Sequence, residues 1–312
     1  MLDVRQLEAL VAVLEHGSFG AAAGQLHLTL AAVSLRVKAL EETLGQRLLV
    51  RGKRLRATIA GQALLAHARQ LQLMEADLLA SLPGHLPVAG QDWQRLSVAV
   101  NADSVAAWFL PGVAPLLRRQ RLLLDIVVDD QDHTHDALGS GEVSGCVTTL
   151  ARPMHGCVAE PLGVMRYRCV ALPELVQPCL AAGTAISPHR LLALPAVIFN
   201  RKDGLQDIFL ERHFGLRQAA YPRHFVPATD AFMAALELGL GWGMVPEHEL
   251  ARRVVGRPPL VDVLPEATVD VALYWQHWLR EAPSAQALTR AVKEAARAQL
   301  APIETHARNG KE

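Results

Sequence analysis

The side chains with the most evident chemistry lie between residues 36 and 56, where positive charge is concentrated. Seven basic residues stand here against two acids, a local balance of +5, although the chain of 312 residues has a net charge of zero. The cations are Arg36, Lys38, Arg47, Arg51, Lys53, Arg54 and Arg56. Cations at this density neutralise nucleic-acid phosphates, and the alternative is an ordinary solvated surface.

Two short amphipathic helices are expected to position these cations. The apolar residues between Phe19 and Leu26, and between Val33 and Leu44, recur with the spacing of a helical stripe. Ser18 and Thr29 stand where a side-chain oxygen can cap each helix. Only His27 and Leu28 separate the first helix from the Thr29 cap of the second. So short a link predicts a helix-turn-helix, whose second helix can enter a major groove.

The outer face of the second helix is a candidate reading surface, which would present Ala31, Ser34, Leu35 and Lys38, with Arg36 on its flank. Ser34 can bond a base or a phosphate, Leu35 can touch a thymine methyl, and Lys38 is a strong donor. Because this face is small and largely apolar, we expect DNA shape to contribute to specificity.

Behind that helix, Arg51, Lys53 and Arg54 flank Gly52 and predict a basic hairpin, or wing. Such a wing follows the DNA backbone or enters a narrow minor groove. Residues 1–60 hold eight basic and five acidic residues, a balance of +3, so the rest of the chain balances to −3. The DNA affinity is therefore expected in residues 1–60.

A long helix is expected after the wing, capped by Thr58 and ending near Leu82, before the breaker Pro83-Gly84-His85-Leu86-Pro87. Its apolar stripe is broader than one contact surface needs, which favours pairing with a second copy. The alternative is a helix packed only on its own domain.

From Trp93 onwards, apolar strands alternate with helical stretches, which predicts parallel sheets with crossover helices. Ligands bind beyond the carboxyl ends of such strands. Polar residues follow the expected strands at Asn101, Asp103, Ser104, Asp129, Asp130, Thr148, Thr149, Asn200, Thr229 and Asp230. They offer donors for a carboxylate and acids for a cation, although each can simply cap a helix.

Several other classes of protein are disfavoured. No basic leader precedes an apolar segment, and no run approaches the ~18 apolar residues of a membrane span, so we expect a cytoplasmic protein without membrane contact.

Four cysteines without a C-x-x-C unit are expected to be buried free thiols, and the tract from Asp132 to Asp136 lacks partner ligands for a metal. No G-x-S-x-G, H-E-x-x-H or P-loop pattern indicates an enzyme. The glycines between Leu236 and Pro246 are expected to follow a helix and lead into a strand. A dinucleotide-binding loop has the reverse order, from strand to helix.

The N-terminal segment resembles the DNA-binding domain of LysR-type transcriptional regulators. The runs SFxxAAxxL, T-x-x-AVS, LE-x-x-LG, LLVR and T-x-AG carry the resemblance from Ser18 to Gly61. It implies DNA contacts at Ser18, Thr29, Leu30, Ala31, Ser34, Leu35, Arg36, Lys38, Arg51, Lys53 and Arg54. One departure is Leu30, where the family usually has glutamine, so the operator sequence does not carry over.

The resemblance implies an α/β fold with three parts. These are an N-terminal winged helix-turn-helix (1–60), a linker helix that serves in dimerisation and is followed by a hinge (61–90), and a two-lobed effector domain like a periplasmic binding protein (91–312). Lobe I would span about 91–166 and 271–312, and lobe II about 167–270. It also implies promoter DNA and RNA polymerase as partners, a homodimer or homotetramer, and a small-molecule effector without a cofactor.

Three further runs, LSVAVNADSVAAWFLPGVAPLL, GEVSGCVTT and LYW, resemble the subgroup that responds to lysine or arginine and activates a basic amino-acid exporter. In that interpretation Ser104 and Thr148 or Thr149 hold the effector carboxylate, and Asn101 or Asp103 takes its ammonium. Asp129, Asp130 or Asp230 meets the distal charge, because a buried cation needs a carboxylate. The alternatives are a regulator of a different metabolite, a transport-type binding protein and a hydrolase.

Overall fold

The computed structural model describes residues 2–50, 55–82, 93–128, 137–180, 186–252 and 256–303. Five residues of the expected sites lie outside these ranges, namely Arg51, Lys53, Arg54, Asp129 and Asp130. The expected hinge at 83–90 and the histidine tract at 132–136 also lie outside them. Their roles stay predictions.

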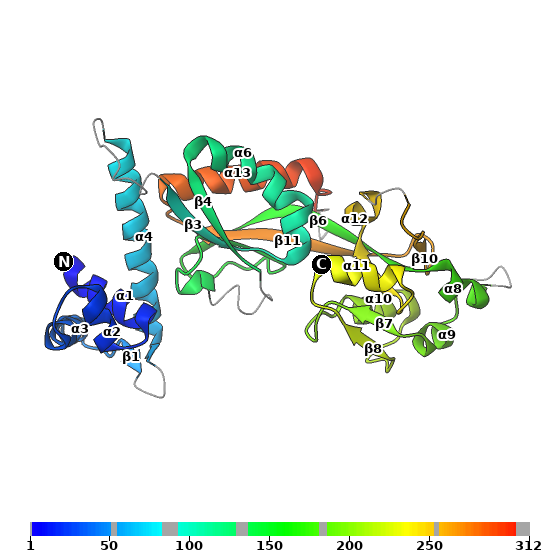
Figure 1. Cartoon of the computed structure of the whole chain (residues 1–312), viewed down its shortest axis with the longest axis horizontal. Coiled ribbons are helices and arrows are strands. Elements are labelled where there is room, and N and C mark those ends of the chain that lie inside the picture. Colours follow the sequence, from blue (N-terminus) through cyan, green and yellow to red (C-terminus); the bar gives the residue numbers. More distant parts are fainter. Residues whose placement is uncertain are drawn as a thin grey trace, which may run out of the picture.

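The N-terminal domain is a three-helix unit with a short hairpin (Figure 1). Helices α1 (Val4–His16), α2 (Phe19–Gln25) and α3 (Leu30–Leu44) are followed by strands β1 (Leu49–Val50) and β2 (Arg56–Ala57), which pair antiparallel. Val33, Val37 and Leu40 on α3 are buried, as the apolar spacing predicted. The helix-turn-helix prediction is confirmed, and the hairpin strands lie where the wing was expected.

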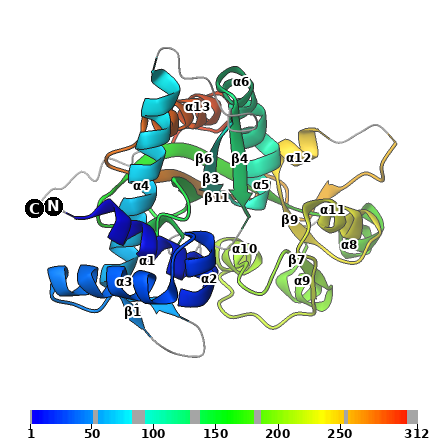
Figure 2. The same cartoon turned by 60° about the vertical axis from the view of Figure 1, so that its left-hand side comes forward.

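Helix α4 (Ile59–Ser81) leaves this domain and is capped by Thr58, whose Oγ1 accepts from the backbone N–H of Gly61. At ~1.5 Å per residue it is about 35 Å long. Its first half packs on the N-terminal domain, where Leu65 and Ala68 join a core with Leu10 and Leu40. Figures 1 and 2 show α4 between that domain and the larger part of the chain. The expected long helix is confirmed.

A seven-stranded sheet organises the rest of the chain, in the order β10-β6-β11-β5-β3-β4, with β9 also paired to β6. Strand β3 (Gln94–Ala99) is parallel to β4 (Leu122–Val127) and β5 (Gly145–Thr148). The two longest strands, β6 (Cys157–Ala171) and β11 (Thr268–Trp278), pair antiparallel with each other. The sheet is therefore mixed, which corrects the expectation of parallel sheets.

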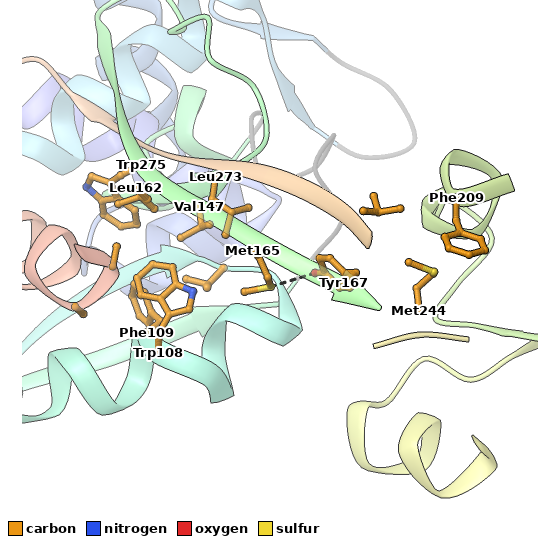
Figure 3. Packing of buried hydrophobic residues seen from close by; sticks show 14 of the residues in the cluster. Trp108, Phe109, Val147, Leu162, Met165, Tyr167, Phe209, Met244, Leu273 and Trp275 are labelled. Atoms are coloured by element: carbon orange, nitrogen blue, oxygen red, sulfur yellow. Dashed lines mark hydrogen bonds between the residues drawn. The ribbon is translucent and has the colours of Figure 1, made fainter. Parts of the chain in front are cut away.

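We call lobe I the part built on β3, β4 and β5, together with the helices that cover them. Helices α5 (Ala102–Ser104) and α6 (Leu110–Gln120) are joined by a π-helical turn, η1 (Val105–Phe109), and α13 (Pro283–Gln299) packs beside α6. The fully buried Trp108, Phe109 and Trp275 fill the space between helices and sheet (Figure 3). A Cβ on Gly112 would overlap the side chain of Ala295, so α6 and α13 are in close contact.

We call lobe II the smaller part at the other end of β6 (Figure 1). It holds β7 (Ala196–Ile198) parallel to β8 (Arg223–Phe225), with β9 (Gly243–Pro246) and β10 (Val261–Asp262) paired to β6. Its helices are α8 (Pro173–Leu180), α9 (Pro188–Ala193), α10 (Leu205–Phe214), α11 (Thr229–Glu237) and α12 (Glu247–Ala251). The alternation expected from Trp93 onwards singled out no helix at α10, whose two faces differ little in polarity.

The cysteine expectation needs one correction, because Cys146 and Cys169 are buried but Cys157 is only partly buried. Burial raises the pKa of Cys146 to about 12 and that of Cys157 to about 11, so both remain thiols at neutral pH. Within the described ranges, every helix is too short or too polar to span a lipid bilayer.

Candidate DNA-contacting and effector sites

The turn between α2 and α3 is fixed by side-chain caps. Ser18 Oγ accepts from the N–H of Ala21 at 3.1 Å, and Thr29 Oγ1 accepts from the N–H of Ala32 at 3.2 Å. His27 takes a left-handed conformation with φ 53°, which lets the Leu28 N–H donate back to Ala23 O at 2.9 Å. Both capping oxygens thus hold helix ends, so any DNA contact from Ser18 or Thr29 adds to that role.

The face of α3 opposite the core is available to a partner. Leu30 and Leu35 are 57% and 68% exposed, Ala31 and Lys38 are exposed, and Ser34 and Arg36 are partly buried. Lys38 lies 3.5 Å from Glu42, but both side chains are solvated, so this pair holds the lysine only weakly. The six residues lie on the part of α3 that the core leaves accessible and meet the chemical requirements of a reading face.

Glu41 has a structural role that its charge alone did not indicate. Its Oε1 accepts from the backbone N–H of Leu48 at 2.8 Å and of Leu49 at 3.4 Å, and Arg47 lies 3.5 Å from its Oε2. One carboxylate thus fixes the chain between α3 and the hairpin. The signal was the LE pair in the family pattern, which sequence reasoning had counted only as negative charge.

The lobe I side of the candidate effector site begins directly after β3. Asn101 precedes α5 and η1, and Asn101 Oδ1, Ser104 Oγ and Trp108 Nε1 are buried with no hydrogen-bond partner among the described residues. Buried polar groups are usually paired, so unpaired ones indicate room for a ligand or water. A π-helical turn is also frequent at functional sites. The predicted Asn101 and Ser104 therefore offer free hydrogen-bonding capacity.

Asp103 lies beside these groups and bonds to strand β6. Tyr167 Oη donates to Asp103 Oδ2 at 2.8 Å, and Figure 3 shows Tyr167 on β6 between the two lobes. Burial raises the pKa of Asp103 to about 6; the Tyr167 bond opposes this, and the nearby charges of Asp203 and Glu249 add to it. The pKa of Tyr167 is itself raised by burial and by Asp103.

Two acids of lobe II thus act on an acid of lobe I. Asp203 lies between β7 and α10, where its Oδ1 accepts from Leu205 N and its Oδ2 from Phe199 N, and Glu249 lies on α12. The lobes also touch here, because Arg252 Nη1 donates to Ala106 O of η1 at 3.0 Å. Sequence reasoning missed both acids. A capping position before α10 could have indicated Asp203, whereas nothing in the pattern singled out Glu249.

The other expected effector residues are more dispersed. Thr148 is buried at the end of β5, where its Oγ1 accepts from Leu150 N at 3.2 Å, and Thr149 is partly buried. Asn200 Oδ1 accepts from the N–H groups of Lys202 and Asp203 and so shapes the turn that holds Asp203. Thr229 is partly buried and Asp230 exposed in the first turn of α11. Of the acids, Asp203 and Glu249 are those of lobe II whose charges act on Asp103.

Comparisons with known proteins show the family to which the chain belongs. Residues 4–62 match the model of the bacterial regulatory helix-turn-helix protein, lysR family, and residues 89–297 match the LysR substrate binding domain. The regulator LysG of Mycobacterium tuberculosis is 44% identical over 296 residues, which cover 95% of this chain and 94% of the relative.

Two solved structures are similar over nearly the whole length. The crystal structure of ArgP from Mycobacterium tuberculosis has a TM-score of 0.86 at 41% identity and covers 97% of this chain and 100% of its own. Full-length LysG from Corynebacterium glutamicum, with bound effector arginine, has a TM-score of 0.81 at 33% identity and covers 96% and 100%. Members of the LysR family are DNA-binding transcriptional regulators and not enzymes. The two matched segments and the long shared alignment show that the chain belongs to this family of bacterial regulators, in its ArgP/LysG subgroup.

Proposed function

We propose that this regulator responds to a basic amino acid, arginine or lysine, and controls the gene of a basic amino-acid exporter from promoter DNA in the cytoplasm. The observation that carries the proposal is the buried carboxyl of Asp103, which follows β3 with three buried polar atoms that have no partner among the described residues, those of Asn101, Ser104 and Trp108. We call Asp103 and the two lobe II acids whose charges act on it, Asp203 and Glu249, the acidic cluster. A buried cation is stable only beside carboxylates, and the two lobe II acids are close enough to raise the pKa of Asp103.

The groups beside the acidic cluster suit the other end of an amino acid. Asn101 Oδ1 can accept from an α-ammonium, and Ser104 Oγ and Trp108 Nε1 can donate to an α-carboxylate. Thr148 and Thr149 stand at the end of the neighbouring strand β5. A guanidinium or ammonium placed in the acidic cluster would offset the repulsion among its three acids. The arginine bound in the LysG relative supports the same class of ligand.

Effector binding would draw the lobes together, because its cation contacts both. The Arg252 to Ala106 bond lies at the same boundary and would persist or shorten on closure. Under this proposal the distal cation meets Asp203 and Glu249, in addition to the sequence-based candidates Asp129, Asp130 and Asp230.

Calorimetric titration of the full-length protein tests the proposal most directly. L-Arginine and L-lysine should bind, whereas L-glutamate, L-leucine and L-citrulline should not, and citrulline is the sharpest control because it has the shape of arginine without its charge. At a hundred times the dissociation constant the bound ligand should add about 2.7 kcal/mol of stability.

Site variants separate this proposal from a regulator that responds to another metabolite. Asp203→Asn and Glu249→Gln should each weaken arginine binding at least tenfold, and Asp125→Asn on β4 is a control with the same loss of charge in lobe I. Equal binding of citrulline and arginine, or no binding of either basic amino acid, would leave a LysR-type regulator with a different effector. A transport-type binding protein is disfavoured because residues 4–62 form a DNA-binding domain.

We also propose that the protein acts as a dimer, or as a tetramer of two dimers, that contacts RNA polymerase at the promoter. The second half of α4 and its C-cap support self-association, since Leu71, Met74 and Leu78 on the helix and Leu82 at its C-cap are 36–59% exposed. These four residues, which we call the α4 stripe, follow helical spacing and give a second copy an apolar surface.

A further inference from the structure

Helix α4 presents a second face that is already occupied within the same chain. Ala66, Arg69, Leu73 and Asp77 lie along it, about a third of a turn around the helix from the α4 stripe. Ala66 is 1% exposed, and Leu73 packs against the main core of lobe I. We call these four residues the docking face, because lobe I lies against them (Figure 2).

Arg69 connects three parts of the molecule. Its Nη2 donates to Glu15 Oε1 of α1 at 3.2 Å, and its Nη1 donates to the backbone O of Ser140 in lobe I at 3.4 Å. The next residue, Gly141, has φ +70°, and a Cβ there would lie 2.5 Å from Ala66 Cα. The backbone of lobe I therefore touches the backbone of α4 at this point, and a side chain cannot be inserted without moving one of them.

Asp77, about two turns further along α4, completes a helix of lobe I. Its Oδ2 accepts from both the N–H and the Oγ of Ser284, each at 3.0 Å. Ser284 is in the first turn of α13, whose own N-cap residue, Ala282, provides no side-chain cap. The linker helix thus supplies the carboxylate that the N-terminus of α13 lacks, which is favourable for its free N–H groups and its dipole.

We propose that Arg69 and Asp77 are positioning residues that couple lobe I to the DNA-binding domain through α4. The connection is continuous: α13 is in close contact with α6, α6 continues η1 of the effector site, and the first half of α4 shares a core with α1 and α3. A shift of α13 therefore moves Asp77, and a shift of the Ser140–Gly141 turn moves Arg69. The effector part of this coupling rests on the proposed function, whereas the docking itself does not.

Hydrogen exchange of the full-length protein tests the coupling without any effector. The probe is a DNA duplex that the protein selects from a random-sequence pool. Coupling is reciprocal, so if lobe I and the DNA-binding domain are linked, DNA binding must change exchange at the start of α13 in the wild type. In Asp77→Ala and Arg69→Gln this change should disappear, although both variants bind the duplex.

Matched variants show whether the named contacts are responsible. Asp77→Asn keeps a capping oxygen and should behave as the wild type, and Glu75→Ala removes an exposed acid from the same helix and should change nothing. Gly141→Ala should act like Asp77→Ala because it separates the turn from Ala66. Gly156→Ala has similar backbone strain at φ +78° but meets only ordinary contacts, and should leave the coupling intact.

A second measurement adds the effector. The ratio of duplex affinities with and without saturating L-arginine should fall below about twofold in Asp77→Ala, against the roughly 5- to 150-fold typical of allosteric coupling, while calorimetric arginine affinity stays unchanged. A DNA-induced exchange change in Asp77→Ala equal to that of the wild type overturns the coupling, whatever the arginine result. If the wild type binds neither arginine nor lysine, the effector proposal fails, and the exchange comparison alone decides the coupling.

Discussion

If Asp103 binds a cationic effector as proposed, effector affinity should depend on pH close to neutrality. Its pKa of about 6 results first from burial and then from the charges of Asp203 and Glu249, against the opposing Tyr167 bond. A cationic effector needs the ionised carboxylate, so its affinity should fall about tenfold between pH 7 and pH 5. Titrations across that range measure the effect. Asp103→Asn should bind more weakly and without this pH dependence, and an unchanged profile in that variant would remove Asp103 from the site.

Ionisation of Asp103, which effector binding would require, lowers the stability of the folded protein. The folded pKa of Asp103 is raised above its ordinary 3.8, so its contribution to stability is most favourable below pH 3.8 and is lost as the pH rises through about 6. At pH 8 without effector, Asp103→Asn should raise the free energy of unfolding, by at most about 3 kcal/mol. Asparagine can still accept from Tyr167, so the comparison isolates the charge.

His277 makes the stability of lobe I depend on pH. Burial lowers its pKa, but the hydrogen bond and charge of Glu281 at 3.1 Å and the charge of Glu160 outweigh this, so the pKa is raised above 6.5. The resulting stabilisation is complete below pH 6.5 and is lost as the pH rises through the folded pKa. His277→Gln should therefore cost about 1.5 kcal/mol at pH 6 and little at pH 9, measured by thermal unfolding. Equal losses at both pH values would mean that packing, not charge, is responsible.

Among the secondary-structure elements, α4 contacts the N-terminal domain and lobe I within the chain, and the proposed dimer would use its α4 stripe as well. Placing glutamate at Leu71 would bury two uncompensated charges across a symmetric dimer interface, at a cost of several kcal/mol. Because Leu71 is 39% exposed in the single chain, Leu71→Glu should fold normally yet sediment as a smaller species. Leu279→Glu, at a 70% exposed position outside α4, is the control. Wild-type sedimentation of Leu71→Glu would place the interface elsewhere.

Local patterns predicted the elements that depend on local physics. The caps at Ser18, Thr29 and Thr58 and the stripe through Val33 and Leu40 are short-range features, and the observed helices begin where those residues indicated. Most of β6 was missed, because half-buried strands that cross between lobes show no regular alternation. Strand direction was wrong for a related reason, since β6 and β11 are far apart in the chain and their pairing leaves no mark on either segment.

The acidic cluster shows the same limit at the effector site. Asn101, Asp103 and Ser104 follow one strand, so the rule for strand ends found them together. Asp203 and Glu249 approach Asp103 only when the second lobe folds back on β6, which no spacing in the sequence records. Distant acids that act on one carboxyl are visible only in three dimensions.

For the whole molecule, the charge is divided unequally between DNA-binding domain and effector domain. Residues 1–60 carry +3 within a neutral chain. Reversing Lys53 and Arg54 to glutamate should abolish binding in a gel shift at unchanged oligomer size, and removing any one phosphate-binding cation should flatten the salt dependence of log K by ~0.9. Reversing Arg118 and Arg119 in lobe I is the control. Wild-type affinity in the Lys53 and Arg54 variant would remove the wing from the interface.

The two lobes are joined by the paired strands β6 and β11, and this has a mechanical consequence. Sliding one strand along the other by a residue would turn every side chain to the wrong face and break the bidentate Arg166 to Asp270 pair that links them. Twisting such a narrow ribbon breaks no bond in its ladder, and two-stranded ribbons twist readily. We therefore expect the joint to resist sliding more than twisting, so a ligand that draws the lobes together would reach lobe I as a rotation about the ribbon axis.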